Sequence, residues 1–186
     1  MWVRGYKQDY DDWESATGSA KWGWNNVLQK FKAIENFDGE TSEYHGYGGK
    51  LYVKQTSKQN QVVENFLNGA VASGYQRYSD INGEILLGNE GCGMTQALIK
   101  ENQRYSILHS YLYPQLENRN FTIATGKTVS KVLVDANGSC VGIQIVDGES
   151  TSNITANEET VLSAGAIESP AILQRSGIGA SGLLSE

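Results

Sequence analysis

The sequence predicts an α/β chain, a mixture of amphipathic helices and short strands, because the spacing of its apolar residues changes along the chain. In the first two thirds they recur every three to four positions, which is typical of helices that bury one face. After Asn118 they fall into short β-rich runs with a period of two, which is typical of strands. Turn residues separate these runs, so we expect an antiparallel β-meander.

Length, composition and charge exclude several classes of function. The chain has 186 residues and a net charge of −6, from 15 basic and 21 acidic side chains. It therefore offers no basic surface for nucleic acid or an anionic membrane. No apolar run approaches the ~18 residues of a spanning helix, so we expect no membrane-spanning segment. The soft metal ligands lack the close spacing of a zinc site, and no metal site is predicted; they are Cys92, Cys140, His45 and His109.

Four helices are predicted before the meander. They cover residues 6–16, 25–35, 60–73 and 106–116. In the second of them apolar residues follow Val27 at i, i+1, i+4 and i+7, which forms one apolar stripe. Gly18 and Gly74 are placed to end the first and third helices. Pro114 interrupts the fourth.

Short strands and loops connect these helices. The stretch 36–49 is polar, rich in glycine and without a period, so we expect a loop, followed by a strand at 51–53. His45 in this loop could touch a substrate, but the default interpretation is a histidine that is hydrogen-bonded to backbone. Residues 80–83 predict a turn, and residues 94–99 a further strand.

The meander leads into a strand-to-helix joint. Its four runs are 121–125, 129–135, 140–147 and 150–156, with tight turns at 136–138 and 147–148. Residues 160–163 predict a buried strand that ends in small residues. The following helix is expected to start at Ser169-Pro170 and to end at 176–179, because Ser is a good N-cap and Pro suits a first turn.

This joint has two physical interpretations. Small residues let the phosphates or sugar chain of a ligand lie against bare backbone, and a helix N-terminus supplies N–H donors and partial positive charge. A tight packing joint between strand and helix, without a ligand, is at least as compatible with the residues alone.

The joint and several other motifs resemble the glucose-methanol-choline (GMC) flavoprotein oxidoreductases in consistent order along nearly the whole chain. The residues 161–179 resemble the second signature of that family. The other matches are Met1-Trp2-Val3-Arg4-Gly5 with Asp9 to Trp13, Trp22-Gly23-Trp24, Tyr44-His45-Gly46 to Val53, Asp80 with Asn82-Gly83, Gln103 to Ser106 with Tyr111 to Pro114, and Asn118 to Ile123.

The resemblance implies FAD as the cofactor and a small-molecule alcohol as the substrate. FAD takes a hydride from the carbinol carbon in this family, a histidine removes the hydroxyl proton, and electrons pass to oxygen or another acceptor. It implies cofactor contacts at Val129, whose backbone would meet the adenine, and at Ser163, Ala164 and Gly165. It also implies a flavin-lid or extended FAD-domain region at 1–43, a substrate-domain segment at 44–103 and a segment of the FAD-binding domain at 104–186.

The chain departs from the family in two ways. Lys50 stands where the family has Pro. The dinucleotide fingerprint that opens chains of this family, and the segment with the catalytic histidine, are both expected to lie outside these residues, so no catalytic residue is predicted here. The chain is accordingly interpreted as an internal fragment that is inactive alone. The alternative is a non-catalytic remnant or binding module of the same fold.

Overall fold

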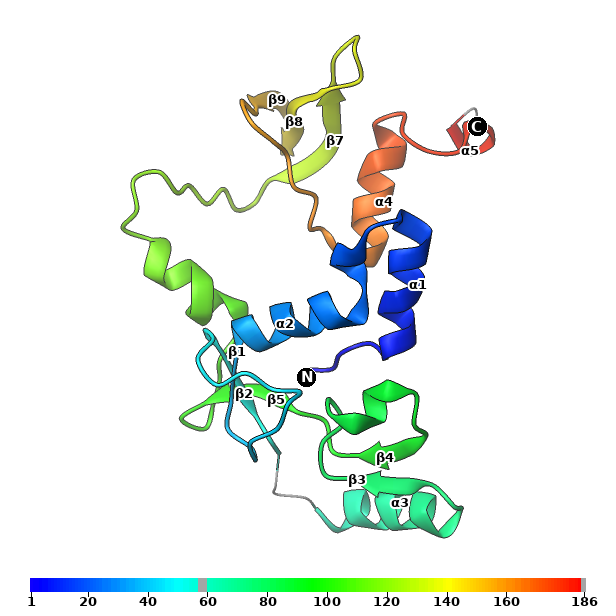
Figure 1. Cartoon of the computed structure of the whole chain (residues 1–186). Helices are drawn as coiled ribbons and strands as arrows, with labels where there is room; N and C mark the ends of the chain where they lie inside the picture. The colour runs from blue at the N-terminus through cyan, green and yellow to red at the C-terminus, as the bar shows by residue number, and fades with distance from the viewer. Residues whose placement is uncertain (57–59, 185–186) are drawn as a thin grey trace. The chain divides into compact units, whose positions relative to one another are not determined.

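The computed structural model describes residues 1–56 and 60–184. It divides into two compact units, residues 1–121 and residues 122–186, which are described separately (Figure 1). The predicted mixture of helices and short strands is confirmed. The predicted three-part division into domains remains a prediction. No helix within the described residues combines the length and apolar character that a membrane crossing needs.

Two helices frame the main hydrophobic core of the first unit. Helix α1 spans Lys7–Thr17 and ends at Gly18, whose φ of 65° is the left-handed conformation that glycine favours. Helix α2 spans Trp24–Ile34, and its apolar stripe packs with α1 and the short 3₁₀ helix η2, Glu84–Leu87. The buried residues of this core are Tyr10, Trp24, Ile85 and Leu86. The sequence therefore predicted both α-helices correctly.

A four-stranded sheet lies beside these helices. Its strands are, in spatial order, β1 (Glu35–Phe37), β2 (Leu51–Lys54), β5 (Ala97–Lys100) and β6 (Gln103–Arg104). Strand β1 pairs in parallel with β2, and the other neighbours are antiparallel. β1 begins one residue before the predicted loop 36–49 and runs into it, because a distant strand supplies its hydrogen-bond partners.

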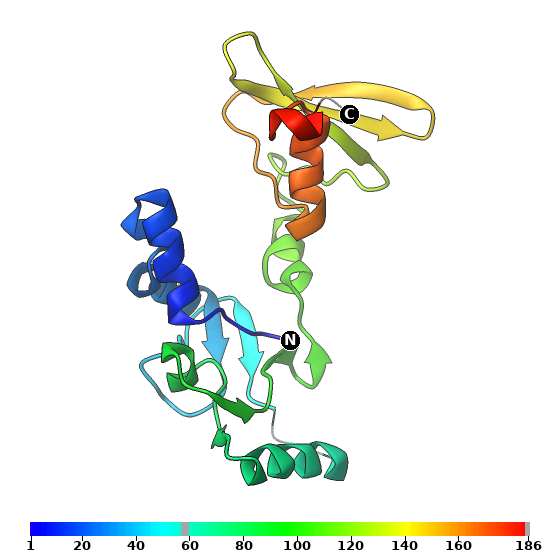
Figure 2. The same cartoon turned by 90° about the vertical axis from the view of Figure 1, so that its right-hand side faces the viewer.

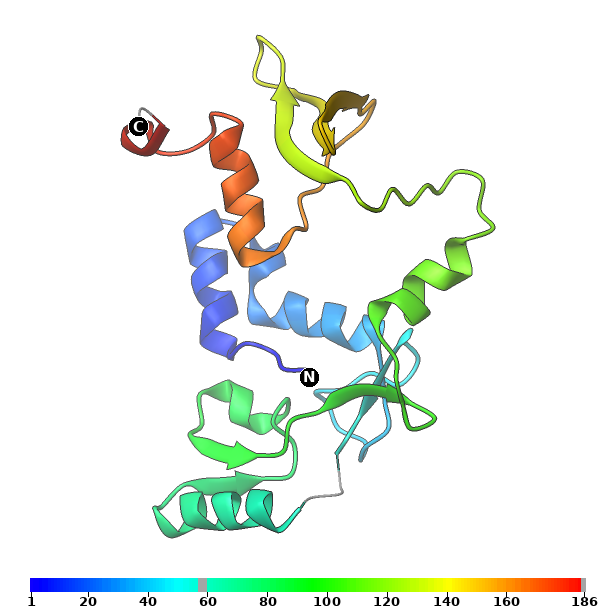
Figure 3. The same cartoon turned by 180° about the vertical axis from the view of Figure 1, so that it is seen from behind.

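Helix α3 (Gln61–Ala72) lies against a pair of parallel strands, β3 (Gln76–Tyr78) and β4 (Gly91–Gly93), as Figure 3 shows from behind. Asn60 caps this helix, because its side chain accepts a hydrogen bond from the backbone N–H of Val63 at 3.0 Å. The predicted turn at 80–83 follows β3.

The remaining helical pieces of the first unit are short. They are the 3₁₀ helix η1 (Ala20–Trp22), the π-helical turn η3 (Leu108–Leu112) and the 3₁₀ helix η4 (Tyr113–Gln115). The last two replace the single helix predicted over 106–116. Pro114 explains the break, because it has no backbone N–H to donate to the preceding turn.

The second unit is a three-stranded antiparallel sheet with one long helix beside it (Figure 2). Its elements are β7 (Thr128–Val134), β8 (Cys140–Asp147), β9 (Ser150–Thr155), α4 (Gly165–Arg175) and the short α5 (Ser181–Leu184). Gly138 and Gly148 have φ of 84° and 59° in the two hairpin turns, as predicted. Val132 of β7 and Ile172 of α4 are buried.

The first predicted strand of the meander, 121–125, is wrong. These residues are irregular, and Phe121 and Ile123 are exposed. An alternating sequence makes a strand only where a neighbouring strand shares its hydrogen bonds, and no described strand pairs with this segment.

Candidate functional site

Three of the predicted cofactor residues, Ser163, Ala164 and Gly165, lie together at the start of α4. The predicted buried strand over 160–163 is wrong, because these residues are irregular and Val161 is 73% exposed. No described strand pairs with the segment. The three small residues are instead exposed on the surface of the unit.

Helix α4 begins at Gly165, one turn earlier than predicted. Ser169 is not its N-cap. The Ser169 hydroxyl accepts a hydrogen bond from the Ala164 N–H at 3.0 Å, so it satisfies a donor at the helix start from within the helix. Pro170 lies inside the helix, where it lacks the N–H that would bond the carbonyl of Ala166.

Gly165 has a backbone conformation that favours glycine. Its φ is 94°, and a Cβ at this position would meet no atom within 4 Å. Close packing is therefore not what requires glycine here, and a side chain would be opposed by backbone strain. The first N–H groups of α4 have no partner within the helix and favour a nearby anion.

Val129 lies on β7, which is an edge strand of the sheet. It pairs with Ile145, whereas Lys131 pairs with Gln144, so Ser130 is an extra residue in the ladder. This is a β-bulge, which bends an edge strand and takes backbone groups out of the regular pattern. A ligand could use such groups, as the predicted adenine contact requires.

Side chains from the end of α4 bind the same edge of β7. The Arg175 Nε–H donates to the Ser130 carbonyl at 2.9 Å, and the Val132 N–H donates to Ser176 Oγ at 2.8 Å. Val129 therefore lies near the C-terminal end of α4, while Gly165 is its first residue. Eleven helical residues span roughly 16 Å, so the predicted residues lie at two places along one helix.

A cluster of buried polar side chains in the first unit was not predicted. We call it the buried polar cluster; its members are Arg4, Glu35, His45, Asp80, Asn82 and Gln96. All are buried except Asp80, whose side chain is 24% exposed. Most belong to motifs of the family resemblance. Their pairing could not be predicted from the sequence because the partners are far apart in it, by 31 residues for Arg4 and Glu35 and by 35 for His45 and Asp80.

Glu35 is the acceptor at the centre of this cluster. Its Oε1 accepts from Arg4 Nη2, from the Gly46 N–H at 2.9 Å and from His45 Nδ1 at 3.0 Å. Its Oε2 accepts from the Trp2 indole N–H at 3.1 Å. Burial raises the pKa of the Glu35 carboxyl, but the hydrogen bonds from His45 and Arg4 outweigh burial, and the pKa lies below its ordinary value.

His45 bridges two carboxylates, so the default interpretation of a histidine bonded to backbone is wrong. Its Nε2 lies 2.8 Å from Asp80 Oδ2, opposite the contact with Glu35, and its ring stacks on Phe37 at 3.7 Å between centroids. Burial lowers the pKa of His45, but hydrogen bonds to Asp80 and Glu35 raise it by more, and the pKa lies above its ordinary value.

Two buried amides complete the cluster. Asn82 accepts from the Arg4 N–H at 2.9 Å and donates to Gln96 Oε1 at 2.7 Å. Gln96 donates to Asp80 Oδ1 at 2.7 Å and to Gln55 Oε1 at 3.1 Å. Together they join the N-terminal residues to the turn after β3, which is the structural use of the Asp80-Asn82 motif.

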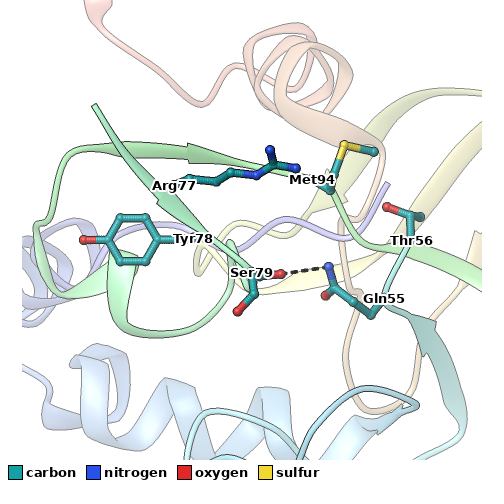
Figure 4. Close-up of a pocket in the computed structure, with 6 residues that line it drawn as sticks. All are labelled: Gln55, Thr56, Arg77, Tyr78, Ser79 and Met94. Atoms are coloured by element: carbon teal, nitrogen blue, oxygen red, sulfur yellow. Dashed lines mark hydrogen bonds between the residues drawn. The ribbon is translucent and has the colours of Figure 1, made fainter. Parts of the chain in front are cut away.

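Two surface pockets lie beside the cluster. One includes Phe37, Gln55, Ser79 and Asp80 in its wall. The other, shown in Figure 4, shares Gln55 and Ser79 with the first and adds Arg77, Tyr78, Met94 and Thr56. Gln55 donates from Nε2 to the Ser79 carbonyl at 2.9 Å between them.

The spacing of a dinucleotide fingerprint, G-x-G-x-x-G, does occur once, at residues 177–182. It follows helix α4 and not a strand, and Gly177, with φ of 78°, lies just past the C-terminus of that helix. A fingerprint needs a strand before it so that the helix behind points at the pyrophosphate. The residues with this spacing therefore follow the end of a helix and do not form a phosphate-binding loop.

Comparison with known proteins shows which class of protein carries this fold. The architecture is that of FAD-dependent oxidoreductases: pyridoxine 4-oxidase from Mesorbium loti superposes with a TM-score of 0.80 at 27% identity, over 99% of this chain and 36% of that one. An FAD-dependent oxidoreductase from Chaetomium thermophilum superposes with a TM-score of 0.83 at 26% identity, over 99% of this chain and 34% of that one.

The family model of the GMC oxidoreductases matches residues 1–184, and the chain belongs to this family. The matched model is that of the family's N-terminal domain, which is its FAD-binding domain.

Curated relatives agree with this assignment. Oxygen-dependent choline dehydrogenase of Brucella anthropi is 33% identical over 186 residues, and that of Escherichia coli is 35% identical over 190. Each alignment covers the whole chain and 33% of the relative. The chain thus spans about a third of the length of the curated relatives it matches.

Proposed function

We propose that this chain forms part of an FAD-dependent oxidoreductase that oxidises the CH–OH group of an alcohol by hydride transfer to flavin. In this proposal it contributes part of the FAD cradle and part of the substrate-cavity wall. Membership of the family supports the reaction class. The geometry at the start of α4 carries the assignment of the cradle.

The cradle is proposed to hold FAD at both ends of α4. Ser163, Ala164 and Gly165 leave bare backbone exposed beside the first N–H groups of the helix, which suits the flavin side of an anionic dinucleotide. Val129 lies on an edge strand with a bulge, where backbone N–H and C=O groups could frame the adenine. FAD is an elongated molecule, so its adenine and its flavin could contact Val129 and Gly165 at opposite ends of α4.

FAD, when bound, supplies the acceptor for the hydride. The chain's own residues bind and orient it. Both ring nitrogens of His45 already contact carboxylates, and neither His45 nor His109 lies in a context that resembles the family's segment with the catalytic histidine. We therefore assign no catalytic residue to this chain.

A small-molecule alcohol is the proposed substrate class. The relatives are named for choline, and a solved neighbour is named for pyridoxine, and both molecules carry hydroxyl groups. We propose that residues 44–103 supply part of the cavity wall.

The test compares two glycine variants of the protein that carries this chain. Gly165→Val should abolish FAD retention and cost roughly 1–3 kcal/mol of stability, because its φ is closed to a β-branched residue. Gly138→Val is the matched control, since it also has positive φ with no atom within 4 Å but lies in a hairpin turn. Flavin absorbance per mole of protein and thermal unfolding of the apoprotein are measured for both.

Loss of flavin from Gly165→Val but not from the control would support the cradle. An equally stable Gly165→Val protein with full FAD would refute it. The isolated 186-residue chain is expected to show no alcohol oxidation and little FAD binding. A stoichiometric yellow flavin spectrum or dye reduction by an alcohol would contradict that expectation.

A further inference from the structure

We propose that His45 is a proton-controlled latch in the first unit. With a proton on both ring nitrogens it joins strand β1 to the turn after β3, and loss of one proton to water at alkaline pH releases that turn. The proposal concerns a residue outside the proposed FAD cradle and does not depend on cofactor binding.

The contacts of the ring determine its charge. Nδ1 lies 3.0 Å from Glu35 Oε1 and Nε2 lies 2.8 Å from Asp80 Oδ2. A neutral imidazole has one N–H donor, so its other nitrogen would place a lone pair against a carboxylate oxygen. Both contacts are attractive when the ring is an imidazolium between two carboxylates.

The acceptor at Nδ1 is an ionised carboxylate. Glu35 Oε1 also accepts from the Gly46 N–H and pairs with the Arg4 guanidinium, and both contacts require a charged or lone-pair oxygen there. At the other nitrogen, Asp80 Oδ1 accepts from the Asn82 N–H and from Gln96, which leaves Oδ2 for His45. The proton that Glu35, His45 and Asp80 could share therefore lies on the imidazole ring of His45.

The charged and titratable groups around the ring come from several elements. Glu35 on β1 and Asp80 in the turn are the two anions, and Arg4 in the N-terminal segment is the second cation. Tyr44 precedes His45 in its loop; burial, followed by Glu43, Glu84 and Asp80, raises the pKa of that phenol. Two cations thus balance two anions in the buried cluster. The raised pKa of His45 agrees with this balance.

Loss of the proton weakens the contact with Asp80 most, because the ring loses its positive charge while Glu35 still pairs with Arg4. Asp80 keeps its hydrogen bonds from Asn82 and Gln96 but loses its only contact with a cation among the described ion pairs. Asp80 and Phe37, which stacks on His45, both belong to the wall of one surface pocket. The protonation state of His45 therefore determines the net charge beside this pocket and how firmly Asp80 is held in its wall.

Nitrogen NMR of protein labelled with ¹⁵N-histidine tests the protonation directly. The signals of His45 are those absent from the His45→Gln variant. We expect both ring nitrogens to be protonated at pH values where an ordinary histidine, with a pKa of about 6.5, is neutral. In Asp80→Asn, which keeps the side-chain size but removes one anion, the midpoint should move to lower pH.

A matched variant, Glu64→Gln, removes a partly exposed carboxylate of the same unit that pairs with Arg77, and the His45 midpoint should not move. A midpoint at or below about 6.5 in the unaltered protein would overturn the proposal. So would an unchanged midpoint in Asp80→Asn.

Stability tests the release of the turn. The pKa of His45 is higher in the folded state than in the unfolded state, so its contribution is complete below about pH 6.5 and is lost as pH rises through the folded pKa. We expect the Tm of the protein to fall across that range and the fall to be absent from His45→Gln. If His45→Gln does not fold, the same loss should occur at lower pH in Asp80→Asn. A Tm that is independent of pH across the NMR midpoint would overturn the latch.

Discussion

The two units of this chain use their polar groups in opposite ways. The first unit buries charged side chains and satisfies them with one another, as at Arg4, Glu35 and His45. Among its described residues, the second unit buries no charged side chain, its buried hydrophobic side chains are Val132 and Ile172, and it leaves Ser163 to Gly165 exposed. The contrast separates a region whose shape depends on internal ion pairs from one whose backbone is available to a ligand.

A buried ion pair is not by itself evidence of stability, because removing two charges from water costs as much as their attraction returns. Its effect appears when one partner is removed. The buried polar cluster therefore makes the first unit sensitive to single substitutions, whereas the second unit depends on its strand ladder and on a few bonds between α4 and β7.

Arg4→Ala is expected to have the largest effect. It would leave Glu35 buried with one cation fewer, at a cost of about 3–5 kcal/mol. Urea unfolding would measure the loss. The control is Arg77→Ala, which removes an exposed arginine of the same unit and should change stability far less. Equal losses in the two variants would mean that burial of the Arg4 pair does not matter.

Acid should also distinguish the two units. The pKa values of Glu35 and Asp80 lie below their ordinary values in the folded state, so their contribution is complete above about pH 4 and is lost as pH falls through the folded pKa values. We expect the first unit to unfold at a higher pH than the second. Hydrogen exchange of β2 and β8 during acid titration would follow each unit. Simultaneous loss of protection would contradict the expectation.

The sequence predicted elements whose signals are local. The apolar stripe of α2 and the glycine turns of the meander depend on residues within a few positions of one another, and both were confirmed. The strands predicted at 121–125 and 160–163 failed because a strand depends on a distant partner. Ser169-Pro170 misplaced a helix start because a serine can cap from inside the first turns.

The candidate site follows the same division. Gly165 could be singled out from sequence, since a positive φ has a local residue preference, and the structure gives it φ of 94°. The buried polar cluster could not, because no local rule pairs Arg4 with Glu35 or His45 with Asp80. The only signal was that several of these residues lie in motifs of the family resemblance.

Ser176→Ala is expected to have the smallest effect and tests how the edge of β7 is held. Ser176 Oγ accepts from the Val132 N–H at 2.8 Å and donates to the Ile172 carbonyl at 2.6 Å, so it links β7 to the end of α4. Alanine leaves the Val132 N–H without this acceptor, at a cost of about 1–2 kcal/mol. Thermal unfolding and hydrogen exchange of the Val132 amide would measure this loss, with Ser150→Ala, at an exposed position, as the control.

Because this link lies on the same edge as Val129, FAD affinity should fall together with protection of Val132 if the proposed adenine contact holds. Faster exchange at Val132 with unchanged FAD affinity would locate the adenine elsewhere, whereas unchanged exchange would show that Ser176 does not hold the edge.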